Sequence, residues 1–225
     1  VQSATDLFND TYLSKQWHYY NQGNIVTGLQ VGCDINVLPA WEKGVKGKDN
    51  VVVAVIDSGV DLDHEDLKDN IWTGYDENGN VIHGYDFVYN SYLIDGNDHG
   101  THVAGTIAAV NNNGIGVCGV AGGDAALGIK GAQIMSCQIF SGSNGGNAHE
   151  AIVWAANHGA VIAQNSWGYP KEDNPDMNDT PKVLKDAIDY FNQYAGCDEN
   201  GEQLPDSPMK GGVVIFAAGN EGVAQ

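Results

Sequence analysis

An α/β fold, a doubly wound parallel sheet with helices on both faces, is predicted by two features of the sequence. Short apolar runs rich in Val and Ile recur along the 225-residue chain and are bounded by Gly, Ser or Asn, which is typical of buried parallel strands. Longer segments between these runs carry apolar residues at helical spacing. Strands and helices that alternate in this way favour a parallel sheet with helices packed on it.

Four strands and three helices are expected. The strands are predicted near residues 51–56, 133–140, 160–165 and 212–217, and the helices near residues 100–110, 147–158 and 181–194. The last apolar run, from Val213 to Ala218, is typical of a strand buried on both faces, so these residues alone are expected to leave a central strand half covered. Residues 1–225 are predicted to form one domain that is incomplete at its C-terminus, with residues 1–45 as an entry segment packed on the surface.

Three short strings contain candidate catalytic residues. In VIDSG, Asp57 follows an apolar strand and lies where open α/β sheets place their sites, at the carboxyl end. In DHGTHVAG, His99 precedes a helical pattern and is expected in the first helical turn. In FAAGNEG, Asn220 follows the last strand. An acid, a base and an amide donor are three of the parts that peptide hydrolysis needs, so the three strings together indicate catalysis although each alone is weak.

Composition excludes some classes of function. The net charge of -19 argues against a nucleic-acid partner, because phosphate binding requires a basic face. No run of about 18 apolar residues is present, so a membrane span is not expected. The acidic charge suits a secreted or cell-surface protein that binds divalent cations. Four cysteines have neither CxxC nor metal-finger spacing, and the sequence leaves open whether they are free or paired: Cys33, Cys118, Cys137 and Cys197.

These strings resemble those of the subtilisin-like serine proteases, the subtilases, whose catalytic residues occur in the order Asp, His, Ser. The resemblance implies a subtilisin-like fold and a serine endopeptidase. It also implies that Asp57 is the triad aspartate, His99 the general base and Asn220 the side chain of the oxyanion hole. The strings NDTYLSKQWHYYN and GCDINVLPAW resemble the entry segment of kexin-like and related bacterial members.

The nucleophilic serine of the family lies in a GTSMA-like string, and no such string occurs in these residues. Ser58 adjoins the proposed triad aspartate and Ser166 belongs to a proposed substrate edge, so neither is expected to replace it. We expect the chain to be the larger fragment of a nicked or artificially cut protease, with the serine absent or carried on a companion C-terminal fragment, and to be inactive alone. The alternative is a catalytically dead peptide-binding fragment or pseudoprotease.

The resemblance also implies a structural calcium ion. Two carboxylates, a side-chain amide and three main-chain carbonyls would supply oxygen ligands, the type that calcium prefers. The implied ligands are Asp10, Asp66, Val110, Asn113, Ile115 and Val117. A loop without metal is the alternative, because an NNNG segment is also an ordinary turn.

Peptide or protein substrates would add as an extended strand between two edges, as the resemblance implies. One edge would be formed by Ser166, Trp167 and Gly168, the other by Ser141, Gly142 and Ser143, and the primary pocket would be lined by Ala217, Ala218 and Gly219. Kexin-like enzymes that cut after paired basic residues carry an acid directly after the triad aspartate, where this chain has Ser58. Glu172 and Asp173 cannot be assigned to the pocket from sequence, so a broad endopeptidase is expected.

Overall fold

The computed structural model describes residues 7–23, 30–168 and 180–220. These residues belong to two compact units. The first unit comprises residues up to 49 together with 63–71 and 104–133. The second comprises residues 50–62, 72–103 and those from 134 onward. No described helix is long and apolar enough to cross a membrane.

A five-stranded sheet organises the second unit, in the order β11-β10-β1-β7-β4. Parallel pairing joins β1 to β10, β10 to β11, and β4 to β7. The sequence predicted four of these strands, and their observed bounds lie within two residues of the predicted ones. The strands are β1 (Val52–Asp57), β4 (Gly84–Asp86), β7 (Gln133–Gln138), β10 (Ile162–Asn165) and β11 (Val213–Phe216).

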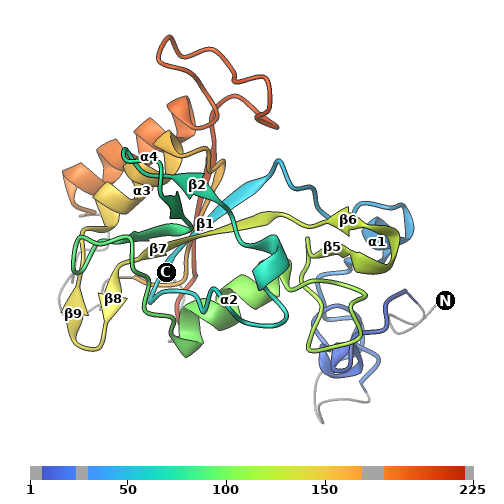
Figure 1. Ribbon diagram of the computed structural model, residues 1–225. Coiled ribbons are helices and arrows are strands. Elements are labelled where there is room, and N and C mark those ends of the chain that lie inside the picture. The colour runs from blue at the N-terminus through green and yellow to red at the C-terminus, as the bar shows by residue number, and fades with distance from the viewer. Residues whose placement is uncertain (1–6, 24–29, 169–179, 221–225) are drawn as a thin grey trace. The chain divides into compact units, whose positions relative to one another are not determined.

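Helices flank this sheet, which confirms the predicted α/β class. Two of them, α3 (Ala148–Asn157) and α4 (Lys182–Tyr194), lie side by side against one face (Figure 1). That face is built from alternate residues of the central strand, Val52, Ala54 and Ile56, which share a core with Phe191 of α4. Period-two alternation explains this arrangement, because every second side chain points to the same face.

The remaining elements are short apart from α2. They comprise the helices α1 (Leu38–Glu42) and α2 (Asp98–Ala108), the 3-10 turns η2 (Leu13–Lys15), η3 (Lys68–Asn70) and η4 (Ala125–Leu127), and three hairpins. The hairpins pair β2 (Gly74–Tyr75) with β3 (Val81–Ile82), β5 (Gly123–Asp124) with β6 (Ile129–Lys130), and β8 (Phe140–Ser141) with β9 (Asn144–Gly145).

The last strand differs from the expectation. The strand is half covered, as expected for these residues alone, with Val213, Ile215 and Phe216 46%, 45% and 38% exposed, but it is not a central strand. Among the described residues β11 is the edge strand of the sheet and pairs only with β10. An apolar run records the side-chain chemistry of a strand but not which neighbours cover it.

The first unit has its own aromatic core. Tyr19 and Trp41 are almost completely buried, and their rings pack edge to face with centroids 5.0 Å apart. The Trp41 indole donates to the Val120 carbonyl, and the Tyr19 hydroxyl donates to the Cys118 carbonyl at 2.7 Å. Two aromatic residues of the entry segment, which was expected to pack on the surface, therefore contribute the centre of this unit's core.

Candidate active site

Asp57 is the last residue of β1 and is only 2% exposed. Its Oδ1 atom accepts hydrogen bonds from the backbone amide and the hydroxyl of Ser58, at 2.7 and 3.1 Å. The predicted placement at the carboxyl end of a buried strand is therefore confirmed. Hydrogen bonds from these donors fix the orientation of the Asp57 carboxylate.

His99 lies in the first turn of α2, as the sequence predicted. Asn97 precedes the helix, and its side-chain oxygen accepts the backbone amide of His99 at 3.2 Å, which is the bonding pattern of an N-cap. Gly100, which follows His99, cannot be replaced by a larger residue without a clash, because its Cβ atom would lie 2.2 Å from the carbonyl oxygen of Gly59. The start of the helix can therefore approach the turn that follows Asp57.

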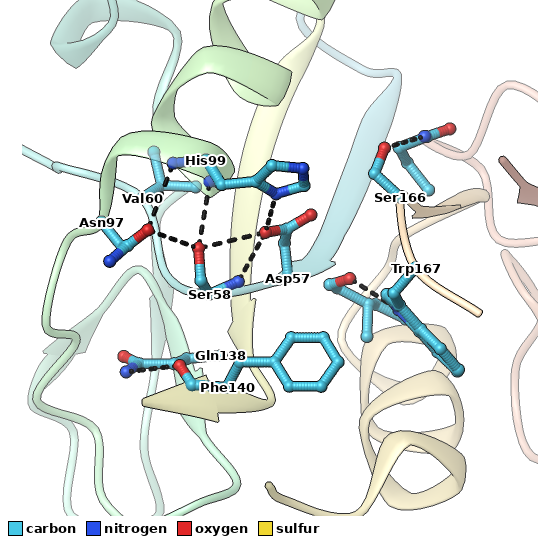
Figure 2. A network of polar contacts seen from close by, with 12 residues as sticks. Asp57, Ser58, Val60, Asn97, His99, Gln138, Phe140, Ser166 and Trp167 are labelled. Carbon is cyan, nitrogen blue, oxygen red and sulfur yellow. Dashed lines mark hydrogen bonds and ion pairs between the residues drawn. The ribbon is translucent and has the colours of Figure 1, made fainter. Parts of the chain in front are cut away.

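The two side chains meet, as Figure 2 shows. Nδ1 of His99 lies 2.6 Å from Oδ1 of Asp57. The contact is asymmetric, since the His99 side chain is 60% exposed whereas Asp57 is buried. A carboxylate at Nδ1 holds the ring proton there and leaves the lone pair of Nε2 available, which is the arrangement of a general base.

Ser58 and Asn97 complete this network, and the sequence did not predict their part in it. The Ser58 hydroxyl accepts the Gly100 amide at 3.1 Å and lies 3.0 Å from the Asn97 side-chain oxygen. It therefore connects the end of β1 to the start of α2. The sequence does show a polar residue directly after Asp57 and another shortly before His99. Their spacing does not reveal that they are hydrogen-bonded to each other's segments.

Neither serine near the site is arranged as a nucleophile. Ser58 lies on the Nδ1 side of the imidazole with Asp57, while the other ring nitrogen points away from it (Figure 2). The hydroxyl of Ser166 accepts a hydrogen bond from the Gln164 side chain at 3.0 Å. A nucleophile would have to approach Nε2, since Nδ1 is already engaged.

Asn220 follows β11 and is exposed. Because β11 and β1 run in the same direction on either side of β10, the residues that follow them lie at the same carboxyl edge of the sheet. Gly219 has a φ of 86°, a conformation that glycine adopts without strain. The structure thus brings Asp57 and His99 into contact and places Asn220 on the same edge, two strands away.

The two proposed substrate edges come from neighbouring parts of the second unit. The Trp167 indole donates to the carbonyl of Ile56, the residue before Asp57, at 3.0 Å. The same indole packs edge to face with Phe140, with the ring centroids 6.3 Å apart. Phe140 begins β8, so Ser141, Gly142 and Ser143 follow it in the β8–β9 hairpin.

The remaining residues proposed for substrate contact are accessible. Gly142, Ser143 and Gly168 are exposed, and so are the pocket candidates Ala217, Ala218 and Gly219. Glu172 and Asp173 lie outside the described residues.

Gln138 is a further residue that the sequence analysis missed. Its side chain is almost completely buried, accepts the Asp95 amide at 2.9 Å and donates to the Phe140 carbonyl at 3.3 Å (Figure 2). A buried amide with both ends engaged holds its partners at fixed positions. Gln138 therefore fixes the start of the proposed substrate hairpin.

Two buried carboxylates in the first unit correspond to the proposed calcium site. Asp10 is 6% exposed, and its Oδ2 accepts the Asn112 amide at 2.7 Å, while its buried Oδ1 has no partner among the described residues. Asp66 is 2% exposed and accepts the Val117 amide at 2.8 Å. Burial raises the pKa of the Asp66 carboxyl, and the negative charge of Asp10 adds to this effect.

The loop between these carboxylates supplies the other proposed ligands. The Asn113 side chain donates to Asp66 at 2.7 Å, and its oxygen accepts the Ile115 amide at 3.0 Å. Its amide nitrogen thus faces the carboxylate, so Asn113 would have to rotate to offer oxygen to a cation. The described residues contain no group of three or more His, Cys, Asp or Glu side chains suited to a metal, so most ligands would be carbonyls. An unpartnered buried carboxylate oxygen fits a calcium ion, which prefers such ligands.

The family follows from comparison with known proteins. Residues 48–225 match the model of the Subtilase family, Peptidase S8. The chain belongs to the subtilase family. This subtilase is 34% identical over 95% of its length to the Thermophilic serine proteinase of Bacillus sp. (strain AK1), and 35% identical over 88% to the Major intracellular serine protease of Bacillus subtilis. It covers 41% and 54% of those proteins.

Further relatives and solved structures are also proteases. The subtilase is 30% identical over 98% of its length to an Extracellular protease of Xanthomonas campestris, of which it covers 36%. Among solved structures, fervidolysin from Fervidobacterium pennivorans has a TM-score of 0.54 at 26% identity, with 98% of this chain and 26% of that chain covered. The predicted subtilisin-like fold and family are thereby confirmed. The chain spans about half or less of the length of these curated relatives.

Proposed function

We propose that this subtilase supplies the acid, the base and one oxyanion donor of a serine endopeptidase. The observation that carries the proposal is the 2.6 Å contact between His99 Nδ1 and Asp57 Oδ1, on a ring that is otherwise 60% exposed. A structural histidine usually has hydrogen bonds at both ring nitrogens. In His99, Nδ1 is bonded to the buried Asp57 carboxylate, while the ring is largely exposed. That combination is what a general base requires.

The proposed chemistry divides among these residues. His99 Nε2 takes the proton of the attacking hydroxyl as its oxygen bonds to the peptide carbonyl carbon, and Asp57 stays ionised and balances the imidazolium charge. The Asn220 side-chain amide donates to the oxygen on which negative charge develops. When the C–N bond breaks, Nε2 returns its proton to the leaving amine, and water then releases the acyl group by the same steps.

The nucleophilic serine lies outside these residues in this proposal. No GTSMA-like string occurs in the sequence, and the relatives are longer than the part the chain matches. The register of the sheet adds a further argument for a companion segment. Val213 and Ile215 of β11 lie on the same face of the sheet as Val53 and Val55 of β1. Both β11 residues are nearly half exposed, so a companion segment that packs on this face of the sheet would cover apolar surface.

Substrate recognition would use the two edges of the second unit. An extended peptide would bond to the main chain of the Ser141–Ser143 hairpin on one side and of Ser166–Gly168 on the other. The contact between Phe140 and Trp167 supports this arrangement, since it keeps the two edges close. A broad endopeptidase remains the proposal, because Ser58 is committed to the network around Asp57 and does not introduce a charge.

The test uses the full-length protein that contains these residues. We expect hydrolysis of a protein substrate, covalent labelling of one serine by a fluorophosphonate, and loss of both in the His99→Ala variant. His149→Ala is the matched control, since His149 is in α3 and is not part of the site.

A complete protein that binds peptides but neither hydrolyses them nor labels would refute the endopeptidase proposal. It would favour the rival proposal, a peptide-binding pseudoprotease.

Calcium is the proposed structural cofactor. Asp10, Asp66 and Asn113 would hold it with carbonyls of Val110, Ile115 and Val117, and it would neutralise two buried acids that otherwise repel each other. The bare Oδ1 of Asp10 and the raised pKa of Asp66 support this proposal, because both are features of carboxylates that lack a cationic partner.

A secreted or cell-surface location also remains a proposal. The relatives include proteins named as extracellular and as intracellular, so family membership alone does not choose. The high negative charge is the feature in its favour, and detection of the protein in the culture medium of its host would test it.

A further inference from the structure

Cys118 lies next to the proposed calcium site and is not part of the ligand set. It is completely buried, and its Sγ atom is 3.1 Å from Oδ2 of Asp10. A thiol has one proton to donate and a carboxylate can only accept, so the hydrogen bond runs from Cys118 to Asp10. Nothing in the catalytic proposal uses this contact.

The two oxygens of Asp10 are treated differently by the protein. Oδ2 accepts both the Cys118 thiol and the Asn112 amide, while Oδ1 is equally buried and accepts nothing among the described residues. A buried carboxylate oxygen without a partner is costly. The hydrogen bonds to Oδ2 therefore orient the Asp10 carboxylate, and Oδ1 stays available to bind a ligand.

Cys118 is itself held firmly. The Gln16 side chain donates to the Cys118 carbonyl at 2.9 Å and accepts its amide at 2.8 Å, and the Tyr19 hydroxyl bonds the same carbonyl. These three contacts hold the main chain of Cys118 in place, and the hydrogen bond to Asp10 orients its thiol. An apolar side chain would fill the same space but could not donate to the carboxylate.

We propose that Cys118 is a positioning residue of the calcium site, which turns Oδ1 of Asp10 toward the cation, and that the bound cation in return keeps this thiol buried. The inference rests on the proposed calcium site. Hydrogen bonds to metal-binding carboxylates are known to set metal affinity, with losses of about 10–100-fold when they are removed. A cation that binds only the folded state stabilises it, so it should make the openings that expose this buried thiol rarer.

Calcium affinity of the complete protein, measured by isothermal titration calorimetry, is the first test. Cys118→Val fills the space without a donor and is expected to raise the Kd about tenfold or more, whereas Cys118→Ser keeps a donor and should stay within about threefold of wild type. Cys137→Val is the matched control, because Cys137 is equally buried in the second unit and contacts no carboxylate of the described residues. If Cys118→Val binds calcium as tightly as the control, the proposal is wrong.

Thiol labelling gives a second readout that does not depend on substitution. The wild-type protein is treated with N-ethylmaleimide, with calcium or with a chelator, and each cysteine is followed by mass spectrometry. Cys33 is exposed and should label in both conditions, and Cys137 should label in neither. Cys118 should label at least tenfold faster with the chelator, and equal rates would overturn the proposal.

Failure of the calcium site itself gives a different result. If wild-type protein shows no heat of calcium binding and no change in stability with chelator, the site proposal fails and this inference falls with it. If wild type binds calcium but Cys118→Val does not differ from it, only the role of Cys118 is refuted.

Discussion

Asp57 and His99 share a hydrogen bond of 2.6 Å although they lie 42 residues apart and in opposite environments, one buried and one exposed. The acid is fixed by β1 and Ser58, and the base by the N-cap of α2. The contact therefore arises from two rigid element ends and needs no loop to close over it. A site built in this way is pre-organised before substrate arrives.

Replacing Asp57 by Asn should lower kcat of the complete protein about 10⁴-fold. The amide would hold the imidazole in the wrong tautomer and would not balance its charge. Steady-state hydrolysis of a fluorogenic peptide measures the effect. Asp69→Asn, which removes an exposed carboxylate in η3, should leave kcat unchanged. A kcat for Asp57→Asn within tenfold of wild type would contradict the assigned role.

Replacing Asn220 by Ala should lower kcat by about 10²–10³ with a smaller change in KM, because the lost hydrogen bond forms mainly in the transition state. The same peptide assay separates the two constants. Asn200→Ala, in an exposed turn of the same unit, serves as the comparison and should have wild-type kinetics. A rise in KM at constant kcat would instead mean that Asn220 binds the substrate ground state.

Much of the fold and part of the site could be predicted because their signals are local. The apolar run before Asp57 and the helical pattern after His99 each determine where a residue lies in its own element. The edge position of β11 could not be predicted in the same way, since it depends on which strands pair with one another in the sheet. The hydrogen bonds of Ser58 and Gln138 join segments far apart in the chain, and no spacing rule reports such partners.

Lys46 and Asp124 form a partly buried ion pair in the first unit, with Nζ of Lys46 2.6 Å from Oδ2 of Asp124. The same Nζ lies 4.9 Å from the centre of the Phe8 ring. Lys46→Met should lower the free energy of unfolding by about 3 kcal/mol at pH 7, because it leaves a buried carboxylate without its cation. The exposed pair Lys182–Asp186 is the matched control, and Lys182→Met should cost less than about 0.5 kcal/mol. Urea unfolding measures both.

The same pair makes a prediction for pH. Burial alone would raise the pKa of Asp124, but hydrogen bonds from Lys46 and Asn112 outweigh it and hold this pKa below its ordinary value of 3.8. A lowered carboxyl pKa stabilises the folded state above that ordinary value, and the contribution is lost as the pH falls through the folded pKa. The difference between wild type and Lys46→Met should therefore shrink below pH 4. A difference that stays constant down to pH 3 would argue against this origin.

Removal of calcium should destabilise the complete protein. At a calcium concentration of 100 times the Kd, binding adds about 2.7 kcal/mol, so excess chelator should lower the melting temperature by the corresponding amount. Asp66→Asn should abolish most of this calcium-dependent difference, while Asp69→Asn should retain it. Differential scanning calorimetry with and without chelator measures the effect. Equal melting temperatures for wild type in the two conditions would remove calcium from the proposal.

Ile215 provides a test of the companion segment. In this chain its side chain is 45% exposed on the face that also carries Val55, so a charge there would meet water and cost no more than about 1 kcal/mol. If a segment bearing the nucleophile covers that face in the complete protein, Ile215→Asp would bury a charge among apolar groups and should cost at least about 3 kcal/mol. Leu93→Asp, at a site 83% exposed, should cost less than about 0.5 kcal/mol. Urea unfolding of the complete protein compares the two variants, and equal small losses would mean that β11 remains uncovered.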